Sequence, residues 1–382
     1  MAGFTGGRLL TANTERTQRA FPADVSTLLG HSRINCSVTR GAETRRNMEA
    51  QSLGHFELLP TVRPSESLTS DWSVLDNVAN DLYRAGRSDI ALEMLEAAVQ
   101  TMPLDGNLHF IHGRMLAASN RRTEALAALS RALALGTERE VLTVVADVAF
   151  PGPCYKEHLA RLHMYLNPAT YLEIGVFCGE TLCLARSGTS AIGIDPAPRP
   201  EANRVYQADT LVHQLTSDAY FAAIGAGEIA SPAPIGLAFI DGLHLFEQVL
   251  RDFINTEKLC QRDGVIVLHD MLPIASAAAT RQRATSFWCG DVWKVVPCIK
   301  RYRQDLSILT IPTHPSGLTL VTGLDPNSTI LADCFGSAVQ EFLDVPLERT
   351  AMEDGMLGDV ANDWRAVREW LAGGPAGERL IR

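Results

Sequence analysis

Long apolar runs and closely paired cysteines are both missing from this sequence. No stretch of the 382 residues reaches the roughly 18 consecutive apolar residues that a membrane-spanning helix needs. The eight cysteines form no CxxC pair and no zinc-binding spacing, and no apolar signal segment stands near residue 1. We therefore expect reduced thiols, no membrane association and a cytoplasmic protein.

Positive charge is also scarce relative to negative charge. The sequence has 34 Lys and Arg against 44 Asp and Glu, so its net charge is −10. This balance argues against binding along a nucleic-acid backbone and favours a small-molecule partner. Aromatic residues make up only 7% of the chain, but the apolar share of 46% is ordinary for a soluble globular protein of about two domains.

The first 47 residues reverse the sign of the charge, with seven Arg against three acidic residues. They are rich in Arg, Ser and Thr. We expect residues 1–70 to form a disordered basic extension. A translation start at Met48 would agree with this interpretation, and an organelle transit peptide is the alternative.

An internal repeat follows, because a shift of 34 residues places similar residues on one another. Small residues recur where two helices of a hairpin approach closely, and large apolar residues recur where neighbouring hairpins bury a face. The matched pairs are Ala79 with Gly113, Leu82 with Leu116, Ala91 with Ala125, Leu95 with Leu129, and Ala98 with Ala132. The pattern resembles the tetratricopeptide repeat and implies two antiparallel helix pairs within residues 71–140.

The second unit departs from the repeat pattern at Thr137, where the first unit has Pro103, and at His109 and His112. Two units are fewer than the roughly three that bury a solenoid core. The segment 141–150, the following domain or a second subunit is expected to complete that core. The repeats then serve either as a platform for the next domain or as a groove for a peptide or carrier protein.

From Pro151 the pattern changes to short β-branched and apolar runs separated by helical segments. This alternation predicts an α/β domain whose parallel sheet has helices on both faces, with the last two strands forming an antiparallel hairpin. Residues 326–382 are expected to be helical, with Trp364, Val367 and Leu371 on one face. The seven predicted strands span residues 171–176, 191–195, 204–209, 237–241, 264–270, 306–311 and 317–323.

Acidic residues and glycines mark the ends of the first three predicted strands, where an open parallel sheet binds its ligands. Gly175 permits a tight turn, and Gly179 permits close packing of a helix predicted to begin near Glu180. Asp195 is placed to accept two ribose hydroxyls, and Asp209 to meet an adenine edge. With Glu173, these acids suit a cationic ligand better than a polyphosphate, although any one of them taken alone is equally well a strand-end cap.

The fourth and fifth predicted strands end in a denser set of polar residues. Asp241 ends one strand, His244 follows three residues later, and His269 and Asp270 end the next strand. Adjacent parallel strands bring Asp241 and Asp270 within reach of a shared hard cation, for which Mg²⁺ is the natural candidate.

Together these motifs resemble the class I S-adenosyl-L-methionine-dependent methyltransferases, and among them the small-molecule O-methyltransferases that include the macrocin and mycinamicin enzymes. The resemblance implies a seven-stranded, mostly parallel Rossmann-like sheet over residues 141–325, preceded by the small all-α repeat module and followed by C-terminal helices over 326–382. It implies S-adenosyl-L-methionine as the cofactor, bound by Glu173, Gly175, Gly179, Asp195 and Asp209.

The same resemblance implies Asp241, His269 and Asp270 as metal ligands and His244 as the general base. His269 stands where the sugar enzymes often have an acidic ligand, and an imidazole is softer and adds no negative charge. The alternative is therefore a metal-free enzyme in which His269 is a packed residue. For His244, the alternative is a locally hydrogen-bonded residue at a helix start.

We expect methyl transfer to a hydroxyl of a small molecule such as a sugar, a polyketide or another secondary metabolite. Trp288 and Trp293 are candidates for the wall of the acceptor site, and Asp291 for the cap of a helix that begins at Val292. Two alternatives are a scaffold protein with an inactive methyltransferase fold and an enzyme for protein- or carrier-bound substrates. The repeats are the expected surface for a protein partner or for self-association.

Overall fold

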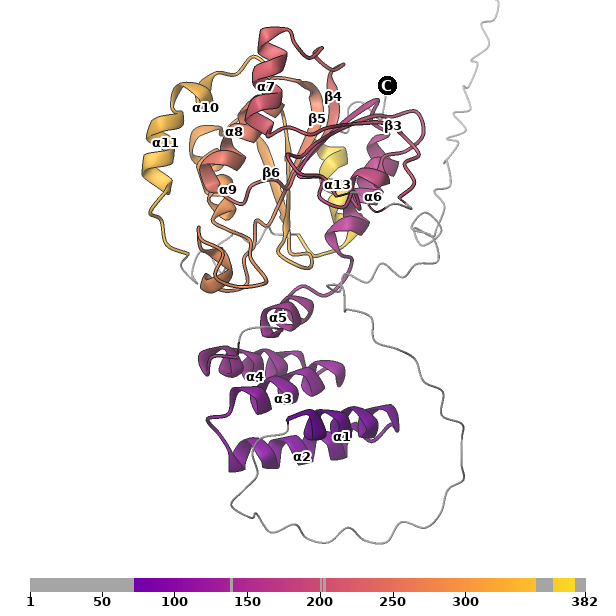
Figure 1. The fold of residues 1–382 in the computed structure, drawn as a ribbon, viewed down its shortest axis with the longest axis vertical. Helices are drawn as coiled ribbons and strands as arrows, with labels where there is room; N and C mark the ends of the chain where they lie inside the picture. Colours follow the sequence, from indigo (N-terminus) through magenta and orange to yellow (C-terminus); the bar gives the residue numbers. More distant parts are fainter. Residues whose placement is uncertain (1–71, 138–139, 200, 202–203, 348–359, 375–382) are drawn as a thin grey trace, which may run out of the picture. The chain divides into compact units, whose positions relative to one another are not determined.

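The computed structural model describes residues 72–137, 140–199, 201, 204–347 and 360–374 (Figure 1). The basic extension predicted over residues 1–70 lies outside these ranges. Within them, no helix combines the length and the apolar character that crossing a membrane requires.

Helices precede the first strand, as the repeat pattern predicts. The first four form two consecutive pairs that span the predicted repeats: α1 (Trp72–Arg84), α2 (Ser88–Thr101), α3 (Gly106–Ala118) and α4 (Arg122–Ala134). Two more follow, α5 (Val141–Ala149) and α6 (Tyr155–Leu166). The prediction of an all-α region before the sheet is therefore confirmed.

Small residues lie where these helices meet. Ala79 and Ala91 are buried in one apolar cluster with Leu95. A Cβ atom at Gly113 would overlap the side chain of Leu129, so α3 and α4 approach closely only because that position has no side chain.

Helix α5 completes the core of this helical module. Val141 and Val145 are buried against α4, and from the same helix Leu142 is buried with Ala278 and Cys289 of the next domain. Two of the three expected sources, the 141–150 segment and the following domain, thus cover the last repeat.

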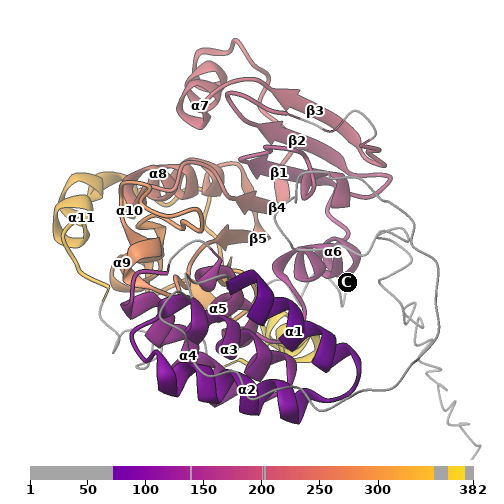
Figure 2. The same ribbon diagram turned by 60° about the horizontal axis from the view of Figure 1, so that its bottom comes forward.

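The second domain is built on a seven-stranded sheet in the order β3-β2-β1-β4-β5-β7-β6. Strand β7 is antiparallel to both of its neighbours, and the other strands run parallel to one another, which confirms the predicted α/β fold class and the closing hairpin. Figure 2 shows β3, β2, β1, β4 and β5 in succession. The strands are β1 (Thr170–Ile174), β2 (Ser190–Ile194), β3 (Asp209–His213), β4 (Ile235–Ile240), β5 (Cys260–His269), β6 (Ser307–Ile311) and β7 (Leu318–Thr322).

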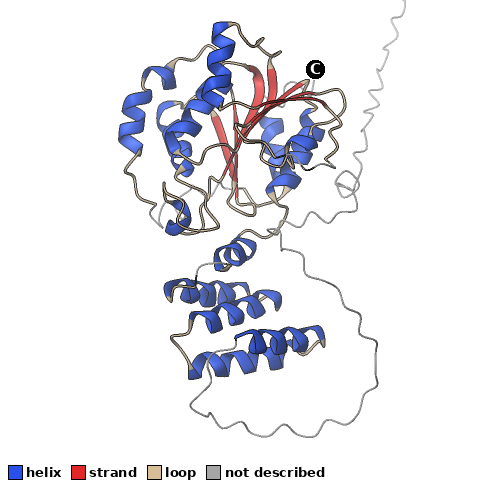
Figure 3. Cartoon of the chain, in the orientation of Figure 1, coloured by secondary structure: helices blue, strands red, loops and turns tan. Residues whose placement is uncertain are grey.

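Helices cover both faces of the sheet (Figures 1 and 3). One face carries α7 (Ser217–Ala226), α8 (Phe246–Glu257), α9 (Val295–Tyr302), α10 (Ile330–Asp333) and α11 (Phe335–Phe342), and the other carries α6 and α13 (Trp364–Gly373). Alternate strand residues enter the two cores: Leu172 faces the first set and Tyr171 the second. Each large apolar side chain buried in this way contributes about 1.5–3 kcal/mol.

Two predicted elements were wrong. The third strand was predicted over 204–209, but β3 begins only at Asp209, and Tyr206 instead packs beside Gly179. The helix predicted near Glu180 is a three-residue 3₁₀ turn, Leu182–Leu184. Both errors lie in connections from which scattered residues, among them Leu184, Tyr206 and Ala208, pack against the core without a helix or strand period.

Candidate active site

A cavity of about 820 Å³ opens at the carboxyl ends of β1, β2, β4 and β5. Six of the nine predicted site residues line it: Gly175, Asp195, Asp241, His244, His269 and Asp270. Glu173, Gly179 and Asp209 do not. The sheet order therefore brings the predicted residues of β4 and β5 to the same place as those that follow β1 and β2.

Gly175 ends β1 in a left-handed backbone conformation, with φ at 91°. A Cβ atom there would overlap the backbone carbonyl oxygen of Asp241, so the glycine is required by the neighbouring strand end. Gly175 thus allows the close approach of the backbone after β4, and the turn follows it at residues 176–179, closed by the Gly179 N–H to the Val176 carbonyl at 2.8 Å.

Asp195 follows β2 and ties two loops together. Its Oδ2 atom accepts a hydrogen bond from the Phe177 N–H at 2.8 Å, and its Oδ1 atom accepts one from the Ala197 N–H at 2.7 Å. Each carboxylate oxygen can accept more than one hydrogen bond, so both retain capacity for hydroxyl donors in the cavity.

Glu173 lies away from the cavity, because it is on the same face of β1 as Tyr171, the face that α6 and α13 cover. Its carboxyl group is fully buried and accepts hydrogen bonds from the Tyr171 hydroxyl at 2.6 Å and the Thr181 hydroxyl at 2.8 Å. Burial raises the pKa of Glu173 to about 8 despite these two hydrogen bonds, so it is mostly protonated at neutral pH. The structure does not support a role in direct contact with a ligand.

Gly179 and Asp209 are also displaced from their predicted roles. A Cβ atom at Gly179 would overlap the Tyr206 hydroxyl, so this glycine makes room for a side chain of the protein itself. Asp209 is the first residue of β3 and pairs with Ser190, the first residue of β2. It therefore lies at the amino edge of the parallel strands, opposite the cavity.

The segment after β3 supplies cavity residues that the sequence reasoning missed. Thr216, Ser217 and Asp218 line the cavity at the start of α7. The Thr216 side chain accepts a hydrogen bond from the Ala219 N–H and so caps the helix. A Thr-Ser-Asp run before an apolar helical segment is a typical helix start, and this signal would have located the residues.

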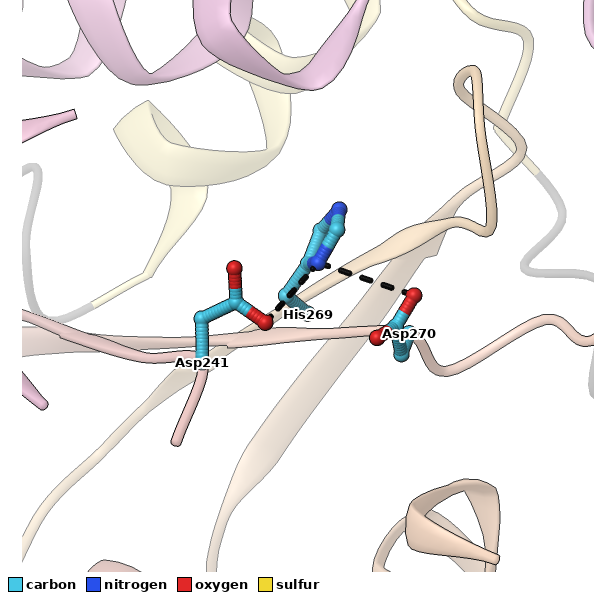
Figure 4. A group of neighbouring side chains, drawn as sticks. All are labelled: Asp241, His269 and Asp270. Carbon is cyan, nitrogen blue, oxygen red and sulfur yellow. Dashed lines mark hydrogen bonds and ion pairs between the residues drawn. The ribbon is translucent and has the colours of Figure 1, made fainter. Parts of the chain in front are cut away.

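Asp241, His269 and Asp270 form a compact cluster (Figure 4). Each offers one ligand atom, and these atoms all lie within 4.8 Å of one another. The His269 Nδ1 atom is 3.1 Å from Asp241 Oδ1 and 3.6 Å from Asp270 Oδ1. The cluster arises because β4 and β5 are adjacent and parallel, as the sequence indicated.

His244 lies between the same two carboxylates. Its Nδ1 atom is 3.3 Å from Asp270 Oδ2 and 3.2 Å from the Trp288 carbonyl oxygen, and its Nε2 atom is 3.5 Å from Asp241 Oδ1. Its ring stacks on the Trp288 indole with centroids 5.1 Å apart. Burial acts to lower the pKa of His244, but Asp270 and Asp241 outweigh it and raise the pKa to about 9.

The carboxylates and the imidazoles of the cluster shift one another's pKa values toward the charged forms. Burial alone would lower the pKa of His269, but Asp241 and Asp270 raise it above its ordinary value. Burial alone would raise the pKa of Asp241, but His269 and His244 hold it well below its ordinary value. The other face of His269 is apolar, because the Tyr155 ring lies 4.2 Å away between centroids.

Asp270 has an uncommon backbone conformation and a buried hydrogen-bond donor beside it. It follows β5 with φ at 64°, a left-handed conformation that a residue with a side chain rarely adopts. The buried hydroxyl of Ser316, in the loop between β6 and β7, donates a hydrogen bond to Asp270 Oδ1. No sequence pattern pointed to Ser316, because its contact with Asp270 spans 46 residues.

The residues after Trp288 differ from their predicted roles. Trp293 is buried in the fold and does not line the cavity. Asp291 does not cap its own helix: it accepts a hydrogen bond from the Phe246 N–H at the start of α8, at 2.9 Å. Trp288 is beside the site, stacked on His244.

Comparison with known proteins identifies the domain. Residues 172–271, which run from β1 to just beyond Asp270, match the family model of a methyltransferase domain. No curated protein matches the chain. The chain therefore contains a methyltransferase domain, within which the cavity residues of β1, β2, β4 and β5 all fall.

Solved structures that align with the chain are distant from it. The S-adenosylmethionine complex of the O-methyltransferase TomG from Streptomyces achromogenes, involved in tomaymycin synthesis, is 15% identical; the alignment covers 49% of this chain and 91% of that one, with a TM-score of 0.34. The S-adenosylhomocysteine complex of an O-methyltransferase from Bacillus cereus is 13% identical, with 51% and 89% covered and a TM-score of 0.34. The methyltransferase PaMTH1 from Podospora anserina is 14% identical, with 44% and 78% covered and a TM-score of 0.34.

Proposed function

We propose that this protein transfers a methyl group from S-adenosylmethionine to a hydroxyl of a small molecule, such as a sugar, a polyketide or another secondary metabolite. His244 is the proposed general base. The observation that carries the proposal is that His244, Asp241 and Asp270 line the same cavity as Gly175 and Asp195. A candidate base thus shares one space with the residues proposed for the cofactor.

The cofactor side of the proposal relies on charge and on unused hydrogen-bond capacity. Asp195 is assigned to the ribose hydroxyls, since each of its oxygens accepts only one backbone N–H. The sulfonium of S-adenosylmethionine is positive, and four carboxylates line the cavity: Asp195, Asp218, Asp241 and Asp270. Opposite charges in a partly buried site favour binding of that cation.

The reaction is an in-line displacement at the methyl carbon. The acceptor oxygen forms a bond to that carbon as the carbon–sulfur bond breaks, and the sulfur keeps the electron pair. A hydroxyl is a weak nucleophile at neutral pH, so its proton must pass to a base. His244 accepts this proton only in its neutral form, which the raised pKa of about 9 makes the minor form at neutral pH. In that form the Nδ1–H donates to the Trp288 carbonyl, which leaves Nε2 as the proton acceptor.

The donor set of Asp241, His269 and Asp270 fits a divalent cation, because two carboxylates and one imidazole offer ligand atoms within 4.8 Å of one another. When bound, such an ion supplies positive charge that lowers the pKa of a nearby acceptor hydroxyl and offsets the carboxylates that raise the pKa of His244. Asp241 and Asp270 would hold the ion, and His269 would complete the set.

Replacement of the proposed base tests the reaction. His244→Ala should lower transfer of labelled methyl groups into a metabolite extract by about 100-fold or more, the range expected for a lost general base. The affinity for S-adenosylhomocysteine, measured by isothermal titration, should change little. Retention of turnover in His244→Ala would remove this residue as the base.

Replacement of Asp195 tests the cofactor site separately. Asp195→Ala should weaken S-adenosylhomocysteine binding by about 10- to 100-fold, since hydrogen bonds to a charged acceptor are lost. Asp209→Ala is the matched control, because Asp209 lies at the opposite edge of the sheet. Equal affinities in the wild type and Asp195→Ala would contradict the assignment.

A further inference from the structure

Arg283 is the only lysine or arginine among the described residues that line the cavity. It belongs to the loop that connects β5 to the 3₁₀ turn Val292–Lys294, called here the acceptor loop (residues 271–290). All four acidic residues of the cavity wall lie outside this loop. Attraction of the positively charged cofactor accounts for the acidic residues of the wall but not for Arg283.

The acceptor loop is closed by its own hydrogen bonds. The N–H groups of Cys289 and Gly290 both donate to the Ala278 carbonyl, at 2.9 and 3.2 Å, and the Trp288 indole N–H donates to the Thr280 carbonyl at 2.6 Å. Ala278 and Cys289 are buried together against Leu142 of α5. Arg283 thus extends from a loop that is closed on itself and packed against the helical module.

The guanidinium of Arg283 is oriented by this loop and not by a carboxylate. Its Nε and Nη2 atoms donate to the carbonyl oxygens of Thr285 and Ser286, at 3.4 and 3.0 Å. Its Cζ atom lies 6.0 Å from the centre of the Trp288 ring. Among the described residues, no carboxylate is paired with it, and its Nη1 atom has no hydrogen-bond partner.

Arg281, two residues earlier, shows the contrast. Its guanidinium donates to both oxygens of Glu247, at 2.9 and 2.7 Å, and to Asp291 at 2.8 Å. The charge of Arg281 is therefore used within the fold. Arg283, by contrast, is exposed, lines the cavity and has no carboxylate partner among the described residues.

We propose that Arg283 binds an anionic group, a carboxylate or a phosphate, of the molecule that occupies the cavity beside His244. The inference rests on the proposed function, because it takes His244 as the residue that meets the acceptor hydroxyl. Trp288 links the two residues: its ring stacks on His244 and lies near the guanidinium of Arg283. A planar guanidinium is well suited to carboxylate and phosphate oxygens.

Two molecules could supply the anion. One is the acceptor, whose hydroxyl must reach His244, and the shared contact with Trp288 favours this source. The other is the amino-acid carboxylate of the cofactor. If the acceptor supplies the anion, it carries both a hydroxyl and an anionic group. The expected substrates are then hydroxylated acids and phosphate esters and not any small alcohol or phenol.

The test uses the full-length protein with Arg283→Gln, which removes the charge, and Arg283→Lys, which keeps it. Gln282→Ala is the control, because Gln282 is exposed on the same loop and does not line the cavity. In the first arm, isothermal titration compares S-adenosylhomocysteine with methylthioadenosine, which lacks the amino acid. In the second, labelled methyl transfer is measured into a metabolite extract separated by anion exchange into anionic and neutral fractions.

We expect label in the anionic fraction, a fall of about 10- to 100-fold in Arg283→Gln, partial recovery in Arg283→Lys, and unchanged cofactor affinity. Weaker binding of S-adenosylhomocysteine with unchanged binding of methylthioadenosine assigns the anion to the cofactor and also supports the proposal. Unchanged values in both arms overturn it. If the wild type binds S-adenosylhomocysteine but labels neither fraction, the proposed transfer fails, and unchanged cofactor affinity in Arg283→Gln then overturns this inference independently.

Discussion

Two acidic residues of neighbouring strands, Glu173 on β1 and Asp241 after β4, differ in protonation. Burial acts to raise the pKa of both carboxyl groups. Asp241 lies beside His269 and His244, and these two outweigh the burial and lower its pKa. Glu173 is hydrogen-bonded to two hydroxyl groups, which offset only part of the burial. At neutral pH, Asp241 is therefore ionised and Glu173 is mostly protonated.

The stability of the protein should accordingly depend on pH through Glu173. Its pKa rises from about 4.5 to about 8 on folding, so the folded state binds the proton more tightly than the unfolded state. The contribution is fully present below about pH 4.5 and is lost as the pH rises through 8. Glu173→Gln, which stays neutral, should lack this part of the pH dependence.

Chemical denaturation of the wild type and Glu173→Gln at a series of pH values between 5 and about 9 would measure the effect. The free energy of unfolding should fall more steeply with pH in the wild type. Parallel curves for the two proteins would contradict the raised pKa of Glu173 in the folded state. Thr181→Val removes a hydrogen bond that lowers the pKa of Glu173, so the fall should keep its slope and extend to higher pH.

At the scale of elements, the loop between β6 and β7 supports the end of β5. Its Ser316 hydroxyl donates to Asp270, and the Leu272 N–H donates to the Ser316 carbonyl. These two contacts hold a segment in which Asp270 has a positive φ. An antiparallel hairpin at the sheet edge thus positions a residue of the proposed cation site.

Ser316→Ala should therefore weaken binding of a divalent cation, if Asp241, His269 and Asp270 hold one. Loss of a hydrogen bond that orients a metal ligand typically costs about 10-fold or more in metal affinity. Mn²⁺ binding measured by electron paramagnetic resonance is a readout that does not depend on turnover. Ser316→Thr retains the hydroxyl and should bind Mn²⁺ more tightly than Ser316→Ala; equal affinities in the wild type and Ser316→Ala would exclude this positioning role.

At the scale of the whole molecule, the helical module and the methyltransferase domain share a small apolar core. Leu142 of α5 is buried with Ala278 and Cys289, which also close the acceptor loop. Leu133 of α4 packs on the same cluster, so the helical module contacts the domain through α5 and the last repeat helix at the loop that carries Arg283. This contact favours the interpretation of the repeats as a platform for the catalytic domain.

Leu142→Ala should loosen the acceptor loop. The lost packing costs about 2–5 kcal/mol, and amide hydrogen exchange at Cys289 and Gly290 should become faster because their N–H groups bond to Ala278. Leu95→Ala is the matched control, since Leu95 is equally buried in the core that helices α1 to α4 form together. Unchanged exchange at Cys289 and Gly290 in Leu142→Ala, or an equal increase in Leu95→Ala, would contradict the coupling.

The sequence by itself determined the features that depend on local pattern. Apolar periodicity was sufficient for the α/β class, for the helices before the sheet and for the antiparallel hairpin at its end. The grouping of Asp241, His269 and Asp270 was also predictable, because successive parallel strands that are neighbours end at the same edge of the sheet. The 34-residue repeat likewise located the close helix contact at Gly113.

Only the tertiary structure decided which predicted residues reach the cavity. Glu173 is directed away from the cavity, and the sequence does not reveal this. Both faces of a central strand are buried, so apolar residues occur on both sides and no polar alternation shows which face a given residue occupies. Asp209 starts a strand that was expected to end there, since an apolar run has no sharp boundary in sequence. Ser316, the Trp288 carbonyl and Arg283 reach the site through contacts between distant segments, and such contacts leave no periodic signal in the chain.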